Sequence, residues 1–379
     1  MSLTSNTVLV VMVSLAVLLF AGTVWLWPRL ARCGWRSVGG RIGLLLCTQV
    51  VLFASVGLAA NQEFGFYASW ADLLGKETAQ GVVVEQAARG AHGAPGGGPL
   101  EVLDTARVAG VDGSRPQVDG QIQKVDIVGR TTRVATPAYV YLPPEYFQPR
   151  YRTRTFPAAV VLTGYPGTAQ ALVTKLHYPR TALELAKNGR MQPMILVMLR
   201  PTVAPPRDTE CVDVPGGPRT ESFFTRDLPD AVAAHYRVGR KAGNWGVIGD
   251  STGGYCALKF AMHRPGAFAA AAGLSPYYKA PIDPTTGDLF HGDGNLRDHA
   301  DLWWLLDHEA APDTSLLVSS SKVGEANYRA TLRFVERVRA KGTTRIASII
   351  LESGGHNFNT WRREIPAALQ WMSGKLSGR

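Results

Sequence analysis

A serine between two glycines is the strongest chemical signal in the chain. Residues 249–253 read G-D-S-T-G, which places Ser251 in the pattern G-x-S-x-G. An apolar run at 245–248 precedes it, and apolar residues at helical spacing follow over 257–262. A strand, a sharp turn and a helix in this order hold a serine hydroxyl ready for nucleophilic attack. The sequence therefore predicts a nucleophile at Ser251, and the alternative is a tight glycine turn without a catalytic role.

A histidine and a carboxylate near the end of the chain complete a hydrolytic set. His356 follows Gly354 and Gly355 after a predicted strand over 346–351, and Glu325 is the carboxylate in the loop after a predicted strand over 315–319. The chain order serine, acid, histidine, with the last two on loops after late strands, is a known order of a catalytic triad. The alternatives are a surface-loop histidine and a carboxylate at a helix N-terminus.

These residue types predict an acyl-transfer reaction. Ser251 attacks an ester carbonyl, His356 takes the serine proton and returns it to the leaving alcohol, and Glu325 holds the imidazole tautomer. The oxyanion requires two backbone N–H donors, and the residue after the nucleophile, Thr252, supplies one. The second is expected from Tyr165, in the turn after strand 158–162, because the neighbouring proline has no N–H. This chemistry requires no metal and no organic cofactor.

Alternating strands and helices must position this set. Strands are predicted at 125–128, 133–142, 158–162, 194–198, 267–274, 315–319 and 346–351, and helices at 170–188, 227–236, 327–341 and from about 364. The run at 158–162 is continuously apolar, as in a strand buried on both faces. Such alternation predicts an α/β fold with a mostly parallel sheet covered on both faces. Together with the serine turn, it indicates an α/β-hydrolase fold over residues 120–379.

Two apolar stretches begin the chain. Residues 7–27 and 42–60 carry no charge, and each is close to the ~20 residues that a helix needs to span a bilayer. Four arginines and no acidic residue lie between them, so the positive-inside rule places this loop in the cytoplasm. We expect residues 1–61 to form a multi-pass anchor in the cytoplasmic membrane, with everything after it outside. A cleaved signal peptide is the alternative, but no basic residue precedes the first stretch.

Residues 62–119 are predicted to join this anchor to the compact domain. The aromatic-rich segment 63–75 could lie along the membrane surface or pack on the domain, and 81–86 could form a short strand. Residues 90–99 have the glycine-rich composition of a flexible linker. The compact domain is expected to begin near Gly120.

The charge of the chain is moderate once the anchor is set aside. The formal net charge is +10, and the four loop arginines account for four of these charges. No dense Lys/Arg run with interleaved aromatics is present, which argues against a nucleic-acid partner. The remaining excess suits a solvated surface or weak attraction to anionic envelope polymers or lipid head groups. The abundance of Ala, Gly and Arg is typical of a high-GC bacterium such as an actinobacterium.

Four cysteines fall in two settings. Cys33 lies in the predicted cytoplasmic loop and Cys47 in the second apolar stretch, whereas Cys211 and Cys256 lie in the exported domain. An oxidising compartment permits a disulfide between the last two, and two buried thiols are the alternative.

From about Gln121 to its end, the chain resembles the esterase D and antigen 85 branch of the α/β-hydrolases, which contains serine esterases and mycolyltransferases. The motifs that carry the resemblance are VYLPPEYF, LTGYPG, SFFTRDLPDAV, GDSTGGYCALKFAMHRPGAF and GGHNFNTWRREIPAALQWM. The resemblance implies a single α/β-hydrolase domain with a triad matching Ser251, Glu325 and His356. The apolar hairpin and segment 277–311, a candidate lid, depart from the family pattern, so mycolate transfer to trehalose is not carried over.

The sequence thus predicts a membrane-anchored serine hydrolase acting outside the cytoplasmic membrane on a carboxylic ester, such as an envelope lipid or glycolipid. Water or an envelope alcohol could accept the acyl group, so esterase and acyltransferase activity both remain open. The second hypothesis is a catalytically inactive hydrolase-fold protein that serves as an envelope binding or scaffold module. Peptidase activity is less favoured because no gating domain is recognisable.

Overall fold

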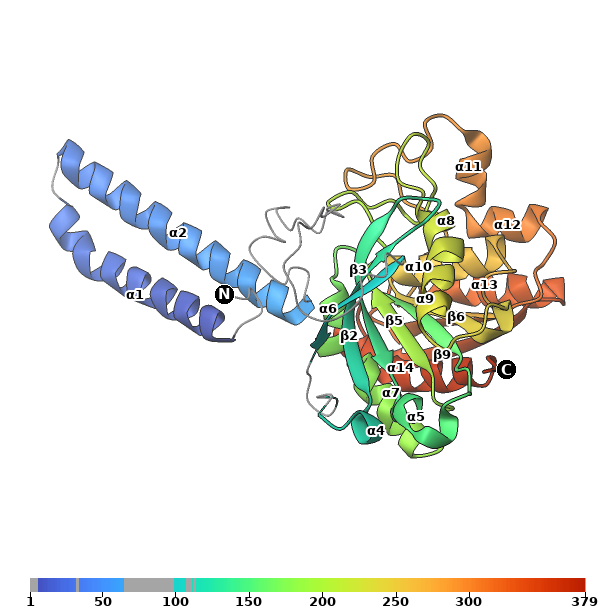
Figure 1. Ribbon diagram of the computed structural model, residues 1–379. Coiled ribbons are helices and arrows are strands. Elements are labelled where there is room, and N and C mark those ends of the chain that lie inside the picture. The colour runs from blue at the N-terminus through green and yellow to red at the C-terminus, as the bar shows by residue number, and fades with distance from the viewer. Residues whose placement is uncertain (1–5, 32–33, 65–98, 107–110, 112–113, 379) are drawn as a thin grey trace. The chain divides into compact units, whose positions relative to one another are not determined.

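The computed structural model describes residues 6–31, 34–64, 99–106, 111 and 114–378 (Figure 1). It contains two compact units, residues 1–77 and 78–379, which are described separately. The predicted strand at 81–86, most of the aromatic-rich segment 63–75 and nearly all of the glycine-rich stretch 90–99 lie outside the described residues.

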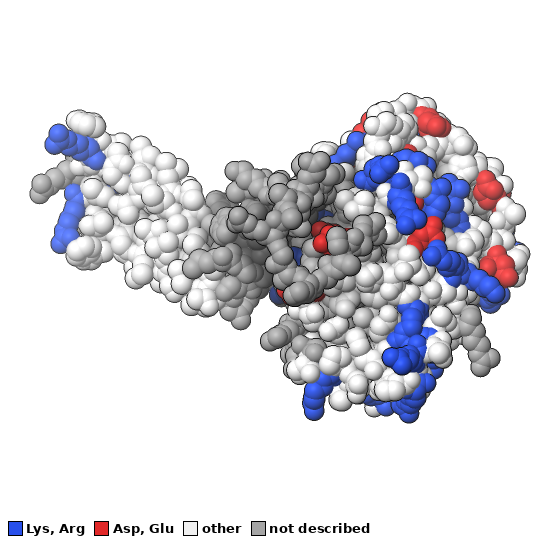
Figure 2. Space-filling model, in the orientation of Figure 1, with Lys and Arg blue, Asp and Glu red and all other residues white. Residues whose placement is uncertain are grey.

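The first unit is a pair of long apolar helices, α1 (Asn6–Leu30) and α2 (Trp35–Phe64). Their spans have mean hydropathies of 2.6 and 2.2, so both are long and apolar enough to cross a membrane. The hydroxyl oxygens of Thr23 and Thr48 lie 3.2 Å apart and join the two helices. Figure 2 shows this pair without charged side chains along its sides and with basic ones at the end where the helices are connected.

The second unit is built on one sheet. Over the described residues its strands are β1 (Leu100–Ala106), β2 (Gln121–Val128), β3 (Ala135–Leu142), β4 (Ala158–Leu162), β5 (Ile195–Leu199), β6 (Trp245–Asp250), β7 (Ala270–Leu274), β8 (Ser315–Val323) and β9 (Arg345–Ser353). The strand order is β1-β2-β3-β5-β4-β6-β7-β8-β9. In this spatial order, the first three pairs (β1 with β2, β2 with β3, and β3 with β5) are antiparallel. The remaining five pairs are parallel. The predicted mostly parallel sheet is confirmed.

Helices cover both faces of this sheet, as Figure 1 shows. They are α4 (Pro116–Asp119), α5 (Pro144–Phe147), α6 (Ala169–Thr174), α7 (Tyr178–Lys187), α8 (Thr220–Ser222), α9 (Leu228–His235), α10 (Thr252–His263), α11 (Gly294–His299), α12 (Leu302–His308), α13 (Tyr328–Lys341) and α14 (Phe358–Ser373). One core lies between the sheet and α9, α10, α12 and α13. A second core lies between the sheet and α6, α7 and α14. Every residue of β4, β5 and β6 is buried, as expected for strands enclosed on both faces.

The sheet begins earlier than the predicted boundary near Gly120. β1 pairs with β2 from Leu100↔Ile127 to Ala106↔Ile122, with one register shift between Val102 and Asp104. The composition of the preceding stretch signals a linker, and the short β1 is stabilised by its pairing with β2 rather than by a pattern of its own. The second unit therefore includes residues that the sequence assigned to a linker.

Two helix predictions differ from the structure. The helix predicted over 170–188 is broken into α6 and α7, because His177 adopts a left-handed conformation with φ of 54°. The last helix begins at Phe358 rather than near 364. Its start is fixed by Asn357, whose side-chain oxygen accepts the N–H groups of Asn359 and Thr360.

Candidate active site

Ser251 stands at a strained turn between β6 and α10. Its φ of 52° and ψ of −120° are unusual for a residue with a side chain, and such conformations are typically found at functional sites. The flanking glycines make the turn feasible. A Cβ on Gly249 would lie 2.4 Å from the Gly253 carbonyl, and one on Gly253 would lie 2.5 Å from the carbonyl oxygen of Leu162. The G-x-S-x-G pattern is therefore a packing requirement of this turn.

The structure brings the three predicted triad residues together. His356 follows β9, and its Nε2 lies 2.8 Å from the Ser251 Oγ. Glu325 follows β8, and its Oε1 lies 3.7 Å from the His356 Nδ1. Because β8 and β9 are neighbours in the sheet, the two loops that carry these residues end side by side. A carboxylate at Nδ1 favours the tautomer with a proton there, which leaves Nε2 able to accept the serine proton.

Glu325 is held as a carboxylate despite its burial. Burial raises the pKa of Glu325, but its interactions with His356 and Ser275 and the hydrogen bond from the Ser321 N–H outweigh it and lower the pKa overall. The Ser321 N–H donates to the Glu325 Oε2 at 2.7 Å. Hydrogen bonding to a charged form stabilises that form, so an ionised carboxylate faces the imidazole at neutral pH.

Two residues that the sequence reasoning missed fix the imidazole and the acid. Trp361 on α14 meets the His356 ring edge-on, with the ring centroids 5.1 Å apart. Its indole N–H donates to the Ser275 Oγ at 2.9 Å. Ser275 directly follows β7 in a left-handed conformation, and its side chain helps to lower the pKa of Glu325. No local pattern marks either residue, because their roles arise only when β7, β8 and α14 pack together.

The turn after β4, residues 163–167, lies against the nucleophile. Its Gly164 N–H donates to the Asp250 Oδ2 at 2.9 Å, and its Gly167 N–H donates to the Gly164 carbonyl at 2.8 Å. These two N–H groups are engaged within the fold and Pro166 has no N–H, and Tyr165 stays the predicted oxyanion donor from this turn. Thr252 is the first residue of α10, where backbone N–H groups point out of the helix and favour negative charge.

A comparison with protein families identifies the class of this chain. The model of the Esterase family matches residues 130–372, a span that includes Ser251, Glu325 and His356. The chain belongs to the Esterase family. The predicted resemblance to the esterase branch of the α/β-hydrolases is thereby confirmed at the level of the family.

Relatives of this chain are distant in sequence, and the solved structures among them are similar in fold. An uncharacterized protein of Corynebacterium glutamicum is 22% identical over 247 residues, which is 63% of this chain and 57% of the length of that protein. An S-formylglutathione hydrolase from Agrobacterium tumefaciens is 17% identical with a TM-score of 0.58, covering 73% of this chain and 99% of its own. A ferulic acid esterase is 18% identical with a TM-score of 0.56, covering 67% and 97%. These solved structures show that the fold is that of the α/β-hydrolases.

A disulfide joins the loop before α8 to the helix that follows the nucleophile. Cys211 and Cys256 are bonded, with their Cα atoms 5.7 Å apart, inside the usual range for disulfides. The buried Lys259, one turn further along α10, donates to the Cys211 carbonyl at 3.0 Å. The same ammonium pairs with Glu221 on α8. The loop is thus attached to α10 at adjacent points, close in sequence to Ser251.

Glu221 is the centre of a buried ionic cluster in the second unit. Besides Lys259, its carboxylate contacts the His263 Nδ1 at 2.6 Å and the Arg264 Nε at 2.7 Å. Burial raises the pKa of Glu221, but the Lys259 ammonium and the His263 ring outweigh it and lower the pKa overall. Three partners satisfy the buried charge, as a stable buried ion pair requires. The cluster was not predicted, because its members are separated in sequence by about 40 residues and meet only in the fold.

A second unpredicted cluster lies beside Thr252. The Tyr277 hydroxyl donates to Glu210, and the Tyr277 ring stacks on Tyr255 with centroids 4.9 Å apart. Tyr277 also hydrogen-bonds to the Thr252 side chain. Burial, and then the nearby Asp208, raises the pKa of Glu210 to about 9. This carboxyl is therefore neutral at pH 7 and accepts the Tyr277 hydroxyl.

The candidate lid, segment 277–311, is attached to the rest of the unit at several points. It contains α11 and α12. The Tyr255 hydroxyl on α10 donates to the Ala300 carbonyl at 2.7 Å. The Arg207 guanidinium, on the disulfide-bonded loop, donates to the carbonyls of Thr286 and Asp288 at 2.8 and 2.6 Å. The segment and the loop therefore form one connected layer.

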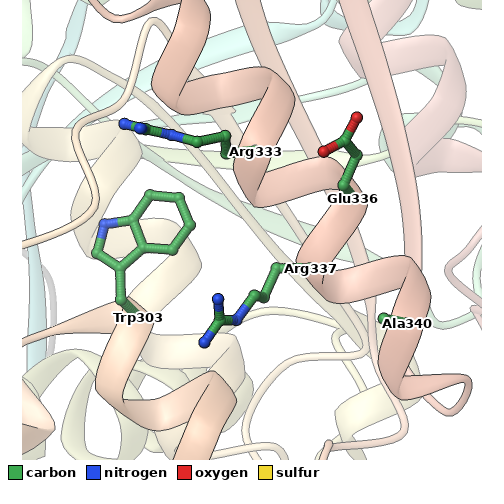
Figure 3. Close-up of a pocket in the computed structure, with 5 residues that line it drawn as sticks. All are labelled: Trp303, Arg333, Glu336, Arg337 and Ala340. Atoms are coloured by element: carbon green, nitrogen blue, oxygen red, sulfur yellow. The ribbon is translucent and has the colours of Figure 1, made fainter.

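A groove of about 690 Å³ lies away from the triad, between α12 and α13 (Figure 3). It is lined by Trp303, Arg333, Glu336, Arg337 and Ala340. In Figure 3 the two guanidinium groups extend toward the Trp303 side, whereas the Glu336 carboxylate points away from it. Arg337 is already paired with Asp307 through two nitrogens. None of the three predicted triad residues is among those that line this groove.

Proposed function

We propose that this member of the Esterase family is a serine hydrolase that cleaves a carboxylic ester through an acyl-enzyme. The observation that carries the proposal is the 2.8 Å contact between the His356 Nε2 and the Ser251 Oγ, with Glu325 behind the imidazole. The site needs no metal for this chemistry, because the nucleophile, the base and the donors are all protein groups.

The chemistry proceeds in two halves. Ser251 Oγ attacks the ester carbonyl while His356 Nε2 accepts its proton, and the tetrahedral oxyanion is received by the N–H groups of Thr252 and Tyr165. Collapse returns the proton from His356 to the leaving alcohol and leaves an acyl group on Ser251. Water or an acceptor alcohol then repeats the sequence in reverse. Glu325 stays ionised throughout and stabilises the imidazolium formed in each half.

We propose that residues 1–61 anchor the enzyme in the cytoplasmic membrane with the catalytic unit outside. The length and hydropathy of α1 and α2 support a spanning pair, and the arginines that connect them support a cytoplasmic loop. The Cys211–Cys256 disulfide supports an oxidising compartment for the catalytic unit. An anchored enzyme of this kind meets esters at the membrane surface, so envelope lipids and glycolipids are the substrates we favour.

The first test is covalent labelling of the detergent-solubilised full chain by a fluorophosphonate probe. We expect one label per chain, lost in Ser251→Ala and strongly slowed in His356→Ala. His235→Ala is the matched control, because His235 is exposed on α9 and outside the triad. A folded wild-type chain that neither labels nor hydrolyses 4-nitrophenyl esters would overturn the proposal and favour the binding or scaffold role.

A second assay separates hydrolysis from transfer. The acyl-enzyme formed from a 4-nitrophenyl ester is offered glycerol or a sugar alcohol in water. Acyl esters of the added alcohol in excess over free acid indicate an acyltransferase. Free acid alone, at every alcohol concentration, indicates an esterase.

A further inference from the structure

Asp250 is a buried acid directly before the nucleophile, and the triad does not use it. It is the last residue of β6, and its side chain is 1% exposed. Side chains alternate between the faces of a strand. Ile248, two residues earlier, belongs to the core beneath α7 and α14, so Asp250 faces that same layer.

One oxygen of Asp250 supports the turn after β4. Its Oδ2 accepts the Gly164 N–H at 2.9 Å. Gly164 is buried, and a buried backbone N–H without an acceptor costs free energy comparable to a lost hydrogen bond. The bond therefore fixes where the backbone of the turn lies.

The supported glycine touches the nucleophile. A Cβ built on Gly164 would lie 2.9 Å from the Cβ of Ser251 and 3.2 Å from the Asp250 Oδ2. The backbone of the turn is thus packed against Ser251 with no space for a side chain. A shift of Gly164 would move the N–H of the next residue, Tyr165, relative to the Ser251 hydroxyl.

We propose that Asp250 is a positioning residue for the oxyanion turn: by accepting the Gly164 N–H, it holds residues 163–167 in register with the carbonyl that Ser251 attacks. This inference rests on the proposed function. Asp250 contacts no reacting atom in this role and acts through Gly164. Oxyanion donors contribute most when they are fixed before the reaction, so a loosened turn lowers the rate of the chemical step more than it weakens substrate binding.

The Asp250 side chain does not need a negative charge to accept the Gly164 N–H. Burial raises the pKa of Asp250 to about 7, against the opposing effects of the Gly164 N–H and of His356. Tyr178 on α7 and Glu364 on α14 interact electrostatically with it, and burial raises the pKa of Glu364 to about 8. A protonated carboxyl still accepts through its carbonyl oxygen. An asparagine at this position therefore preserves both the shape and the acceptor.

The test compares two substitutions that keep the branching of the aspartate side chain, in the full chain. Asp250→Leu removes the acceptor, and Asp250→Asn keeps it. With a 4-nitrophenyl ester, we expect Asp250→Leu to lower kcat by about 10- to 100-fold, less than the loss of an oxyanion donor itself, with KM changed by less than about threefold. Asp250→Asn recovers kcat to within about fivefold of wild type, since it retains the hydrogen bond.

A matched control and a second variant protect the test against misfolding. Tyr178→Phe removes the hydroxyl of a buried side chain in the same layer and keeps the Asp250 acceptor for Gly164, and it is expected to leave kcat within about twofold of wild type. If the near-ultraviolet circular dichroism spectrum of Asp250→Leu differs from that of wild type, kcat is measured for Asp250→Ala instead, which also lacks the acceptor.

Two results would overturn the inference. One is a folded acceptor-free variant with kcat within threefold of wild type, and the other is an Asp250→Asn variant as impaired as Asp250→Leu. In both cases an active, fluorophosphonate-labelled wild type leaves the proposed function standing. A wild type that neither labels nor turns over would instead refute the proposed function, and this inference with it.

Discussion

The two carboxylate oxygens of Glu325 face different partners. The Oε1 lies 3.7 Å from the His356 Nδ1, and the Oε2 accepts the Ser321 N–H at 2.7 Å. The second bond comes from the end of β8, so the strand that delivers the acid also sets its orientation. The imidazole also meets the Trp361 ring edge-on, and the Trp361 indole N–H donates to Ser275, which influences Glu325 as well. Contacts from β8, from the residue after β7 and from α14 therefore position Glu325 and His356 together.

This arrangement predicts the effect of neutralising the acid. Glu325→Gln keeps the shape of the side chain but can present an N–H to the imidazole and favour the wrong tautomer. We expect kcat to fall by about 10²- to 10⁴-fold. Steady-state hydrolysis of a 4-nitrophenyl ester measures this, with the exposed Glu352→Gln as control. Activity within threefold of wild type would assign the acid's role to another residue.

The lowered pKa of Glu325 also predicts a pH dependence of folding. A carboxyl whose folded-state pKa lies below its unfolded value adds stability above the unfolded value, and this is lost as the pH falls through the folded value. The ordinary pKa of a glutamate in an unfolded chain is about 4.5. Below this pH, the free energy of unfolding should therefore fall more for wild type than for Glu325→Gln. Urea unfolding at pH 7 and at pH 4 compares the two proteins. Equal losses would mean that the Glu325 pKa is not lowered.

Glu210 should produce the opposite trend. Its pKa of about 9 in the fold lies above the unfolded value, so its contribution is full at low pH and is lost as the pH rises from about 4.5 toward 9. Glu210→Gln removes this loss, which amounts to at most about 1.4 kcal/mol per pH unit. The melting temperature of Glu210→Gln should rise relative to that of wild type as the pH increases from 5 to 9. A parallel course of the two melting temperatures would contradict the neutral carboxyl.

Features that depend on residues close together in the chain could be predicted from the sequence, whereas contacts between distant residues could not. The Ser251 turn was predictable because its glycines, strand and helix are neighbours in the chain. His356 and Glu325 were found from their places after late strands. In contrast, the contact of Asp250 with Gly164 joins residues 86 positions apart, and Glu210 meets Tyr277 across 67. Neither has a local pattern, because only the packing of the sheet brings them together.

Helix boundaries show the same division. The apolar periodicity over 170–188 continues across the break between α6 and α7. It therefore did not predict the left-handed conformation of His177 that separates the two helices. The end of β1 is likewise set by its pairing with β2 rather than by its own residues.

The disulfide should contribute to stability. A bridge closing a loop of this length constrains the unfolded chain, and its removal commonly costs about 2–5 kcal/mol. The double variant Cys211→Ala, Cys256→Ala should unfold at a lower urea concentration than wild type. Reductant should shift wild type toward the double variant and leave the variant unchanged, since Cys47 forms no bridge in the described part of the chain. A reductant effect of equal size in both proteins would contradict this assignment.

The orientation of the chain is the last prediction, and the cysteines supply the means to test it. Cys33 lies in the arginine-rich connection predicted to be cytoplasmic, and Thr343 is exposed on the catalytic unit. In spheroplasts, a membrane-impermeant maleimide should label a Thr343→Cys variant directly, but Cys33 only after permeabilisation, because a charged reagent does not cross the bilayer core. Cys33→Ser identifies the loop signal. The reverse pattern would place the triad inside the cell, where the Cys211–Cys256 bridge would be unexpected.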